Sequence, residues 1–222
     1  MFPSTSTSNN LVKNAVMNGA RFLSSSINPA TTAVFVCDIQ ENFKNHIYGF
    51  KNMVNTASKM CRIANQFEIP IIVTEQHPKA FGKTVQEIDI SKAALVQEKS
   101  KFSMLTPEIK DLIHNRFKTK SVILCGLESH VCILQTTLDL IKEGIDVYIL
   151  ADGVSSINKS EIDIARKRCM MSGASITSTE SLLFQLLGDA KNPNFKFANK
   201  LIKETKETTK EAMDCFVRDL YK

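Results

Sequence analysis

Three residues of this chain carry side chains suited to nucleophilic and acid–base chemistry, and Cys132 is the first of them. It follows a strand-like apolar run and a short polar turn, and a helical pattern continues beyond it. Ligands collect at such strand-to-helix junctions in open α/β sheets. Peptide dipoles at a helix N-terminus also favour a thiolate, the nucleophilic form of cysteine. Cys132 is therefore a candidate nucleophile, and the alternative is a small residue packed in the core.

Asp38 and Lys99 are the other two candidates. Asp38 ends the first strand-like run, and Lys99 lies just past the third. If these strands are parallel, both residues lie at the same sheet edge as Cys132. A carboxylate there could accept the thiol proton and pass it to a leaving group, while an ammonium could stabilise developing negative charge. The alternatives are a loop-capping aspartate and a solvated loop lysine like its neighbour Lys101.

Strand and helix patterns alternate along most of the chain, which predicts one doubly wound, Rossmann-like α/β domain. The strands should form a six-stranded parallel sheet with helices on both faces. We divide the chain into a polar leader (1–30), a domain (31–203) and a charged tail (204–222). The expected strands are 32–39, 70–74, 93–97, 121–125, 146–152 and 174–178, and the main expected helices are 53–67, 132–143, 160–168 and 180–187, with another beginning near 107.

Composition narrows the class of protein. The 222 residues are 43% hydrophobic and 23% charged, which is ordinary for a globular domain. Six irregularly spaced cysteines without a Cys-x-x-Cys pair favour a reducing compartment over a disulfide framework. The net charge of +5 comes with no alternation of aromatic and basic residues, so we expect no nucleic-acid partner. No apolar run approaches the ~18 residues of a membrane span.

The two ends of the chain are polar. Residues 1–37 contain Lys13 and Arg21 but no acidic residue, which resembles a weak mitochondrial transit peptide and equally a plain polar leader. We expect an intracellular, cytoplasmic protein and leave mitochondrial targeting open. Near the C-terminus an apolar stripe has helical spacing. It predicts a helix that docks on its own domain or on a second subunit, with a solvated tail as the alternative: Met213, Phe216, Val217 and Leu220.

Three segments resemble the signatures of the isochorismatase-like cysteine hydrolases, with most likeness to the eukaryotic isochorismatase domain-containing proteins. They are 36–43 (VCDIQENF), 99–103 (KSKFS) and 125–132 (CGLESHVC). The resemblance spans roughly residues 28–203 and implies a catalytic triad of Asp38, Lys99 and Cys132. It also implies a cis peptide bond at Leu127–Glu128, in a turn that would aim backbone N–H groups, including that of Cys132, at an oxyanion.

Departures from the family pattern refine this expectation. Nicotinamidases of the family bind a metal through an Asp-x-His pair and a later histidine, and the corresponding residues here are Glu75, His77 and Phe81. The third ligand is missing, so we expect neither a metal nor another cofactor, nor nicotinamidase activity. True isochorismatases cleave a vinyl ether without a nucleophilic cysteine, so Cys132 favours acyl chemistry.

These observations predict a hydrolase that cleaves the C–N bond of a small-molecule amide through a cysteine thioester. The first alternative is a binding or scaffold protein that retains the fold without catalysis, and the second is a nuclease assisted by the basic tail. Phe43, Phe102 and His130 lie nearest the triad in sequence and are our candidates for lining a small, partly apolar pocket. Members of this family commonly form oligomers, and the tail carries an apolar stripe, so we also expect a homo-oligomer.

Overall fold

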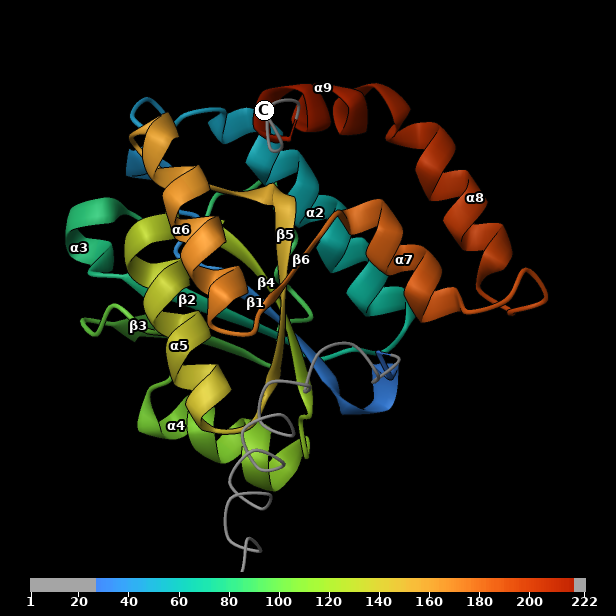
Figure 1. Ribbon diagram of the computed structural model, residues 1–222, viewed down its shortest axis with the longest axis horizontal. Helices are drawn as coiled ribbons and strands as arrows, with labels where there is room; N and C mark the ends of the chain where they lie inside the picture. Colours follow the sequence, from blue (N-terminus) through green and yellow to red (C-terminus); the bar gives the residue numbers. More distant parts are fainter. Residues whose placement is uncertain (1–26, 218–222) are drawn as a thin grey trace, which may run out of the picture.

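A six-stranded sheet runs through the middle of the molecule, in the computed structural model that describes residues 27–217 (Figure 1). All strands are parallel, in the order β3-β2-β1-β4-β5-β6. The predicted fold class is confirmed. The strands are β1 (Thr32–Cys37), β2 (Ile71–Gln76), β3 (Leu95–Lys99), β4 (Ser121–Leu127), β5 (Asp146–Ser155) and β6 (Ser175–Thr177).

The central strands are buried because helices cover both faces of the sheet. Every residue of β1, β2 and β4 is buried, as continuous apolar runs predict for parallel strands. Alternate side chains of β1 enter different cores: Val34 and Val36 belong to one hydrophobic cluster, and Ala33 and Phe35 to the other. The edge strand β6 is only half-buried.

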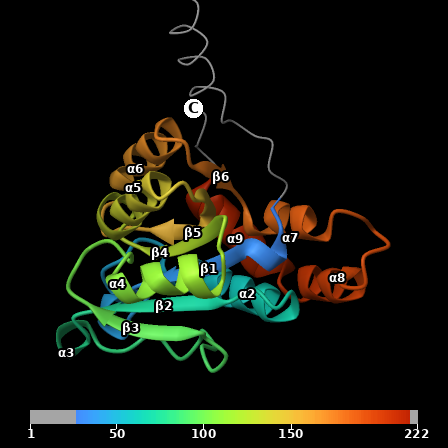
Figure 2. The ribbon, with the colours of Figure 1, turned by 90° about the horizontal axis from the view of Figure 1, so that it is seen from below.

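Two groups of helices form these outer layers, as Figure 2 shows with α5 and α6 on one side of the sheet and α2, α7 and α8 on the other. The first layer contains α4 (Pro107–Asp111), a π-helical turn (Leu112–Arg116), α5 (Leu134–Lys142) and α6 (Lys159–Met171). The second contains α2 (Phe50–Gln66), α7 (Thr179–Leu187), α8 (Phe195–Glu204) and α9 (Lys206–Phe216). Short turns complete the described chain: Pro29–Thr31, Glu41–Phe43, α3 (Pro78–Phe81) and a second π-helical turn (Ser129–Ile133).

Several boundaries differ from the expected ones by a few residues. β3 continues to Lys99 because its end pairs with the last residue of β2, Gln76. β5 continues to Ser155 beyond a shift in its register with β4. At α4 the predicted start is found: the Thr106 hydroxyl accepts a hydrogen bond from the Ile109 N–H at 3.2 Å, and Pro107 opens the helix.

The C-terminal segment docks on its own domain as two helices, α8 and α9, rather than one. Phe216 is 7% exposed and belongs to the same hydrophobic cluster as α2. Its ring lies edge-on to Tyr48 with centroids 6.0 Å apart, and its carbonyl accepts a 2.7 Å hydrogen bond from Arg166. Met213 and Val217 of the stripe are half-buried, whereas Leu220 and residues 1–26 of the expected leader lie outside the described residues.

Across residues 27–217 we find no helix that combines the length and apolar character needed to cross a membrane.

The docking of α9 predicts a measurable loss of stability on truncating its anchor. Phe216→Ala should lower the free energy of unfolding in urea by about 3 kcal/mol, because the lost ring leaves a cavity between α9 and α2. Phe184→Ala is the matched control, since Phe184 is 48% exposed, and it should change stability by less than about 0.5 kcal/mol. Equal effects of the two substitutions would show that α9 is not packed as described.

Candidate active site

The candidate residues converge where the strand order reverses. Successive strands run outward from β1 to β3 on one side and from β4 to β6 on the other, so β1 and β4 flank the topological switch point. In open α/β sheets, ligands bind in the crevice outside the carboxyl ends of the strands at this point. Asp38 follows β1, and Cys132 lies in the π-helical turn after β4. The sheet topology therefore places the carboxylate and the thiol on either side of one crevice.

Asp38 leaves the strand in a left-handed conformation (φ 54°), which aspartate tolerates better than most residues. Its N–H donates to the Thr74 carbonyl at 3.1 Å. Its Oδ1 accepts a 2.8 Å hydrogen bond from the Thr74 hydroxyl, and its Oδ2 accepts one from Lys99 Nζ at 2.7 Å and a longer one from the Cys37 thiol at 3.4 Å. The carboxylate is 2% exposed and fully hydrogen-bonded.

Lys99 is the last residue of β3, and its side chain reaches past the end of β2 to Asp38. The ammonium donates to Gln76 Oε1 at 2.7 Å and to the Lys101 and Phe102 carbonyls at 3.1 and 3.0 Å. Burial by itself lowers the pKa of Lys99, but its interactions with Cys37, Asp38 and Cys132 outweigh burial and leave the pKa raised. The buried group is therefore a cation at neutral pH. Its Nζ lies 3.9 Å from Cys132 Sγ.

Lys101, two residues beyond Lys99, points elsewhere. Its ammonium binds Asp139 at 2.8 Å and the Leu105 carbonyl at 3.2 Å, and its side chain is 51% exposed. Of the two lysines, Lys99 is the one that the structure brings to Asp38 and Cys132.

Gln76 is a site residue that the sequence analysis missed. It ends β2, which lies between β1 and β3, so its amide oxygen faces the Lys99 ammonium. Its own Nε2 donates to the Ser100 carbonyl at 2.9 Å. Its main chain is clamped by Gln40, which accepts from the Gln76 N–H at 2.8 Å and donates to the Gln76 carbonyl at 3.0 Å. The sequence carried no signal for Gln76, because its role depends on β2 lying between β1 and β3, and this strand order is known only from the structure.

Cys37 is a second missed residue. Three potential ligand atoms lie within 4.8 Å of one another: Cys37 Sγ, a carboxylate oxygen of Asp38 and Cys132 Sγ. Cys37 is fully buried and Cys132 is 6% exposed. These three atoms are close enough to bind one metal ion. The Lys99 ammonium, however, already pairs with Asp38 Oδ2, and its positive charge would repel a metal cation. The arrangement fits an ion pair flanked by two thiols better than a metal centre.

The expected cis peptide bond at Leu127–Glu128 is wrong: within residues 27–217 every peptide bond is trans. The chain reverses instead through the left-handed backbone of Glu128 (φ 57°, ψ 72°). This conformation is held by its carboxylate, which accepts from the Ile157 N–H at 3.3 Å, and by its carbonyl, which accepts from Val131 at 2.9 Å. Ser129 N–H donates to the Ser156 hydroxyl at 2.9 Å. The oxyanion role of this turn stays a prediction.

The three predicted pocket residues occupy different places. His130 Nδ1 lies 3.2 Å from the Ser156 hydroxyl and 3.4 Å from Glu128. Phe102 contributes its carbonyl to the Lys99 site while its side chain is 51% exposed. Phe43 stacks on Phe81 with ring centroids 4.7 Å apart. Their role in lining a substrate pocket stays a prediction.

The segment that corresponds to the nicotinamidase metal ligands is engaged in other contacts. Glu75 accepts hydrogen bonds from the Thr84 N–H at 2.8 Å and from Lys83 at 3.1 Å. His77 is exposed and precedes α3 with a left-handed backbone. Phe81 is the stacking partner of Phe43. The expectation that this segment binds no metal stays a prediction.

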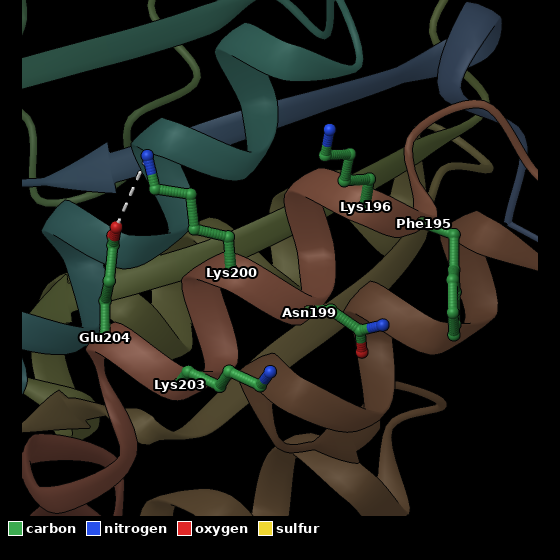
Figure 3. A pocket seen from close by; sticks show the side chains of 6 residues that line it. All are labelled: Phe195, Lys196, Asn199, Lys200, Lys203 and Glu204. Carbon is green, nitrogen blue, oxygen red and sulfur yellow. Dashed lines mark ion pairs between the residues drawn. The ribbon is translucent and has the colours of Figure 1, made fainter.

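A separate hollow lies on the surface of α8, and Figure 3 shows the side chains that line it. Three of its lining residues are lysines, and Glu204 at its rim is paired with Lys200 at 3.7 Å and with Arg62 at 2.6 Å. The hollow is lined by Phe195, Lys196, Asn199, Lys200, Lys203 and Glu204. These residues give the hollow positive charge but no thiol.

Comparisons with known proteins agree with this architecture. Residues 32–181 match the family described as Isochorismatase domain. Isochorismatase family protein 1B of Dictyostelium discoideum is 42% identical over 184 residues, which are 81% of this chain and 89% of that protein. Isochorismatase domain-containing protein 2 of Xenopus laevis is 42% identical over 177 residues, 78% of this chain and 84% of that protein.

A solved structure described as MAR1 ribonuclease from Caenorhabditis elegans has the same fold. It aligns with a TM-score of 0.77 at 39% sequence identity and covers 81% of this chain and 93% of that one. The family match extends from β1 through β6 and includes the strand ends that carry Asp38, Lys99 and Cys132. The chain therefore belongs to the isochorismatase domain family and has the fold of its hydrolases.

Proposed function

We propose that the protein hydrolyses a small-molecule amide with Cys132 as nucleophile. The observation that carries this proposal is the buried ion pair of Lys99 and Asp38, at 2.7 Å, beside the Cys132 thiol at 3.9 Å from Lys99. Asp38 accepts the thiol proton as the sulfur attacks the carbonyl carbon. Lys99 stabilises the negative charge that develops on the thiolate and on the substrate oxygen.

The rest of the cycle follows from the same groups. Asp38 returns the proton to the nitrogen of the collapsing tetrahedral intermediate, so ammonia or an amine leaves and a thioester remains. Water then attacks the thioester with Asp38 as base, which gives the carboxylic acid and the free thiol. Phe43, Phe102 and His130 are the residues that we propose to contact the substrate.

The burial of the site supports a small substrate and argues against a purely structural role. Asp38, Lys99 and Cys132 are each no more than 6% exposed, so a group on a bulky polymer would reach them with difficulty. A buried ion pair is weak evidence for stability, because apolar residues of similar volume stabilise a fold as well or better. We therefore favour catalysis over a binding or scaffold protein that keeps the fold alone.

Hydrolysis should depend on Cys132 and not on the neighbouring buried thiol Cys125. On a panel of primary amides and ureides, Cys132→Ala should reduce kcat/KM at least about 1,000-fold, because the thioester route is lost. Cys125→Ala is the matched control, since Cys125 is fully buried on β4, and it should retain most activity. Mass spectrometry after rapid acid quench should find the acyl group on Cys132. Turnover that survives in Cys132→Ala would exclude the nucleophilic role.

Ribonuclease activity is the second candidate, because the Caenorhabditis elegans protein is described as a ribonuclease and α8 presents three lysines around one hollow. Such a function predicts RNA binding that weakens steeply with salt as phosphate contacts are lost. Lys196→Ala, Lys200→Ala and Lys203→Ala combined should then abolish binding.

The favoured hydrolase function predicts the opposite result. Purified full chain should neither bind single-stranded RNA at physiological salt nor cleave it, and the triple lysine variant should behave like the wild type in fluorescence anisotropy. Salt-dependent binding together with cleavage that requires Lys99 or Cys132 would favour the ribonuclease.

We also propose that the chain forms a homo-oligomer in a reducing compartment, to which its six free cysteines are suited. Since α9 covers α2 of its own chain, we assign the subunit interface to the core and not to the tail. Sedimentation should find one oligomeric state for both the full chain and a truncation that ends at Lys203. A full chain that is monomeric at micromolar concentration would contradict the proposal. Loss of assembly on truncation would show instead that the tail forms the interface.

A further inference from the structure

Cys37 and Cys132 form a pair of thiols on opposite sides of the switch point. Their sulfur atoms lie within 4.8 Å of one another, and both are free. A disulfide needs an S–S separation of about 2 Å, so rotation of the two side chains together with a small backbone shift would have to close a gap of a few ångströms.

The position of Cys37 is fixed by the strand beside it. Gly126 of β4 is the register partner of Cys37, and a Cβ atom on Gly126 would lie 2.2 Å from the Cys37 carbonyl oxygen and 2.8 Å from the Cys37 Cβ. The glycine therefore permits an unusually close approach of β1 and β4. Any larger residue at position 126 would therefore displace Cys37. Cys132 lies in a π-helical turn, a form of helix often found at functional sites.

The two thiols differ in their surroundings. Cys37 is fully buried, and burial, its hydrogen bond with Cys132 and the charge of Asp38 hold its pKa well above the ordinary value. It therefore keeps its proton and donates it in a hydrogen bond to Asp38 Oδ2 at 3.4 Å. Cys132 retains some exposure and has the Lys99 cation 3.9 Å away. A small oxidant would thus meet Cys132 first and find Cys37 behind it.

We propose that Cys132 is a site of oxidation by hydroperoxides and that Cys37 is its resolving thiol. In the first step the Cys132 thiolate attacks one oxygen of the peroxide, which breaks the O–O bond and gives a sulfenic acid and, from hydrogen peroxide, water once a proton is taken up. In the second step the Cys37 sulfur attacks the Cys132 sulfur. Asp38 accepts the Cys37 proton, the sulfenic hydroxyl leaves as water with that proton, and a Cys37–Cys132 disulfide remains.

The consequence is a reversible block of the nucleophile. Sulfenic acid that is not captured is oxidised further to sulfinic and sulfonic acids, which thiols do not reduce. Capture by Cys37 would stop this sequence at a disulfide that a dithiol can reopen. The inference depends only on the two thiols and their reactivity, so it can hold or fail independently of the amide hydrolysis proposed above.

The experiment maps the bond in the full wild-type chain. The protein is treated with hydrogen peroxide, free thiols are alkylated in denaturant, and the peptides are analysed without reduction. Trypsin alone leaves Cys125 and Cys132 on one peptide, because no lysine or arginine lies between residues 121 and 142, so a glutamate-specific protease is added to cleave after Glu128. We expect a linked pair containing Cys37 and Cys132, lower by the mass of two hydrogens.

Two variants test whether Cys37 captures the sulfenic acid on Cys132 or merely lies close to it. After peroxide and then dithiothreitol, wild type should recover most of its Cys132 alkylation by iodoacetamide, whereas Cys37→Ala should recover less than about a tenth, with sulfinic acid on Cys132. Cys125→Ala should behave like wild type. The proposal is overturned if the wild type yields no Cys37–Cys132 peptide, or if Cys37→Ala recovers as fully as the wild type. If Cys37→Ala does not fold, the presence or absence of the linked Cys37–Cys132 peptide in the wild type still tests the proposal.

Discussion

The ion pair between Lys99 and Asp38 is the interaction on which the rest of the site depends. Both side chains are at most 3% exposed, and removing two charges from water costs several kcal/mol for each. The cost is offset only when the remaining hydrogen-bonding positions are filled. Thr74 and Cys37 fill those of the carboxylate, and Gln76 with two main-chain carbonyls fills those of the ammonium.

The sheet supplies these partners because of its strand order. With β2 between β1 and β3, the end of β2 meets the lysine on its way to the aspartate. With β4 on the other side of β1, the thiol of Cys132 enters the same crevice. Elsewhere in residues 27–217, the α8 hollow offers surface lysines, and the α9 segment contributes packing. The proposed function therefore belongs to the sheet edge, and the helices behind it contribute stability.

The fold and the placement of three candidates could be predicted from the sequence because apolar runs fix where parallel strands end. Asp38 follows such a run directly, Cys132 follows one after a short turn, and Lys99 is the last residue of a strand that is slightly longer than expected. Gln76 and Cys37 could not be identified, since their roles depend on which strands are neighbours, and strand order is a tertiary property.

The cis bond at Leu127–Glu128 was expected from the family resemblance alone, and the structure has a trans bond there. A left-handed Glu128, held by hydrogen bonds to Ile157 and Val131, turns the chain there with a trans bond. The tail stripe predicted a docked helix, but helical periodicity cannot say which surface receives it. Phe216 packs against Tyr48 of its own chain, a contact between residues far apart in sequence.

The rate at which iodoacetamide alkylates Cys132, measured across pH in the full chain, tests most directly whether the buried lysine makes this thiol a nucleophile. Labelling is followed on the peptide that begins at Ser129, so that the other cysteines do not contribute, and folding is checked by circular dichroism. We expect Lys99→Met to slow the reaction at neutral pH by at least about tenfold, whereas Lys101→Met, which removes an exposed lysine, should leave the rate unchanged. If a folded Lys99→Met protein is alkylated at the wild-type rate, the buried lysine does not activate this thiol.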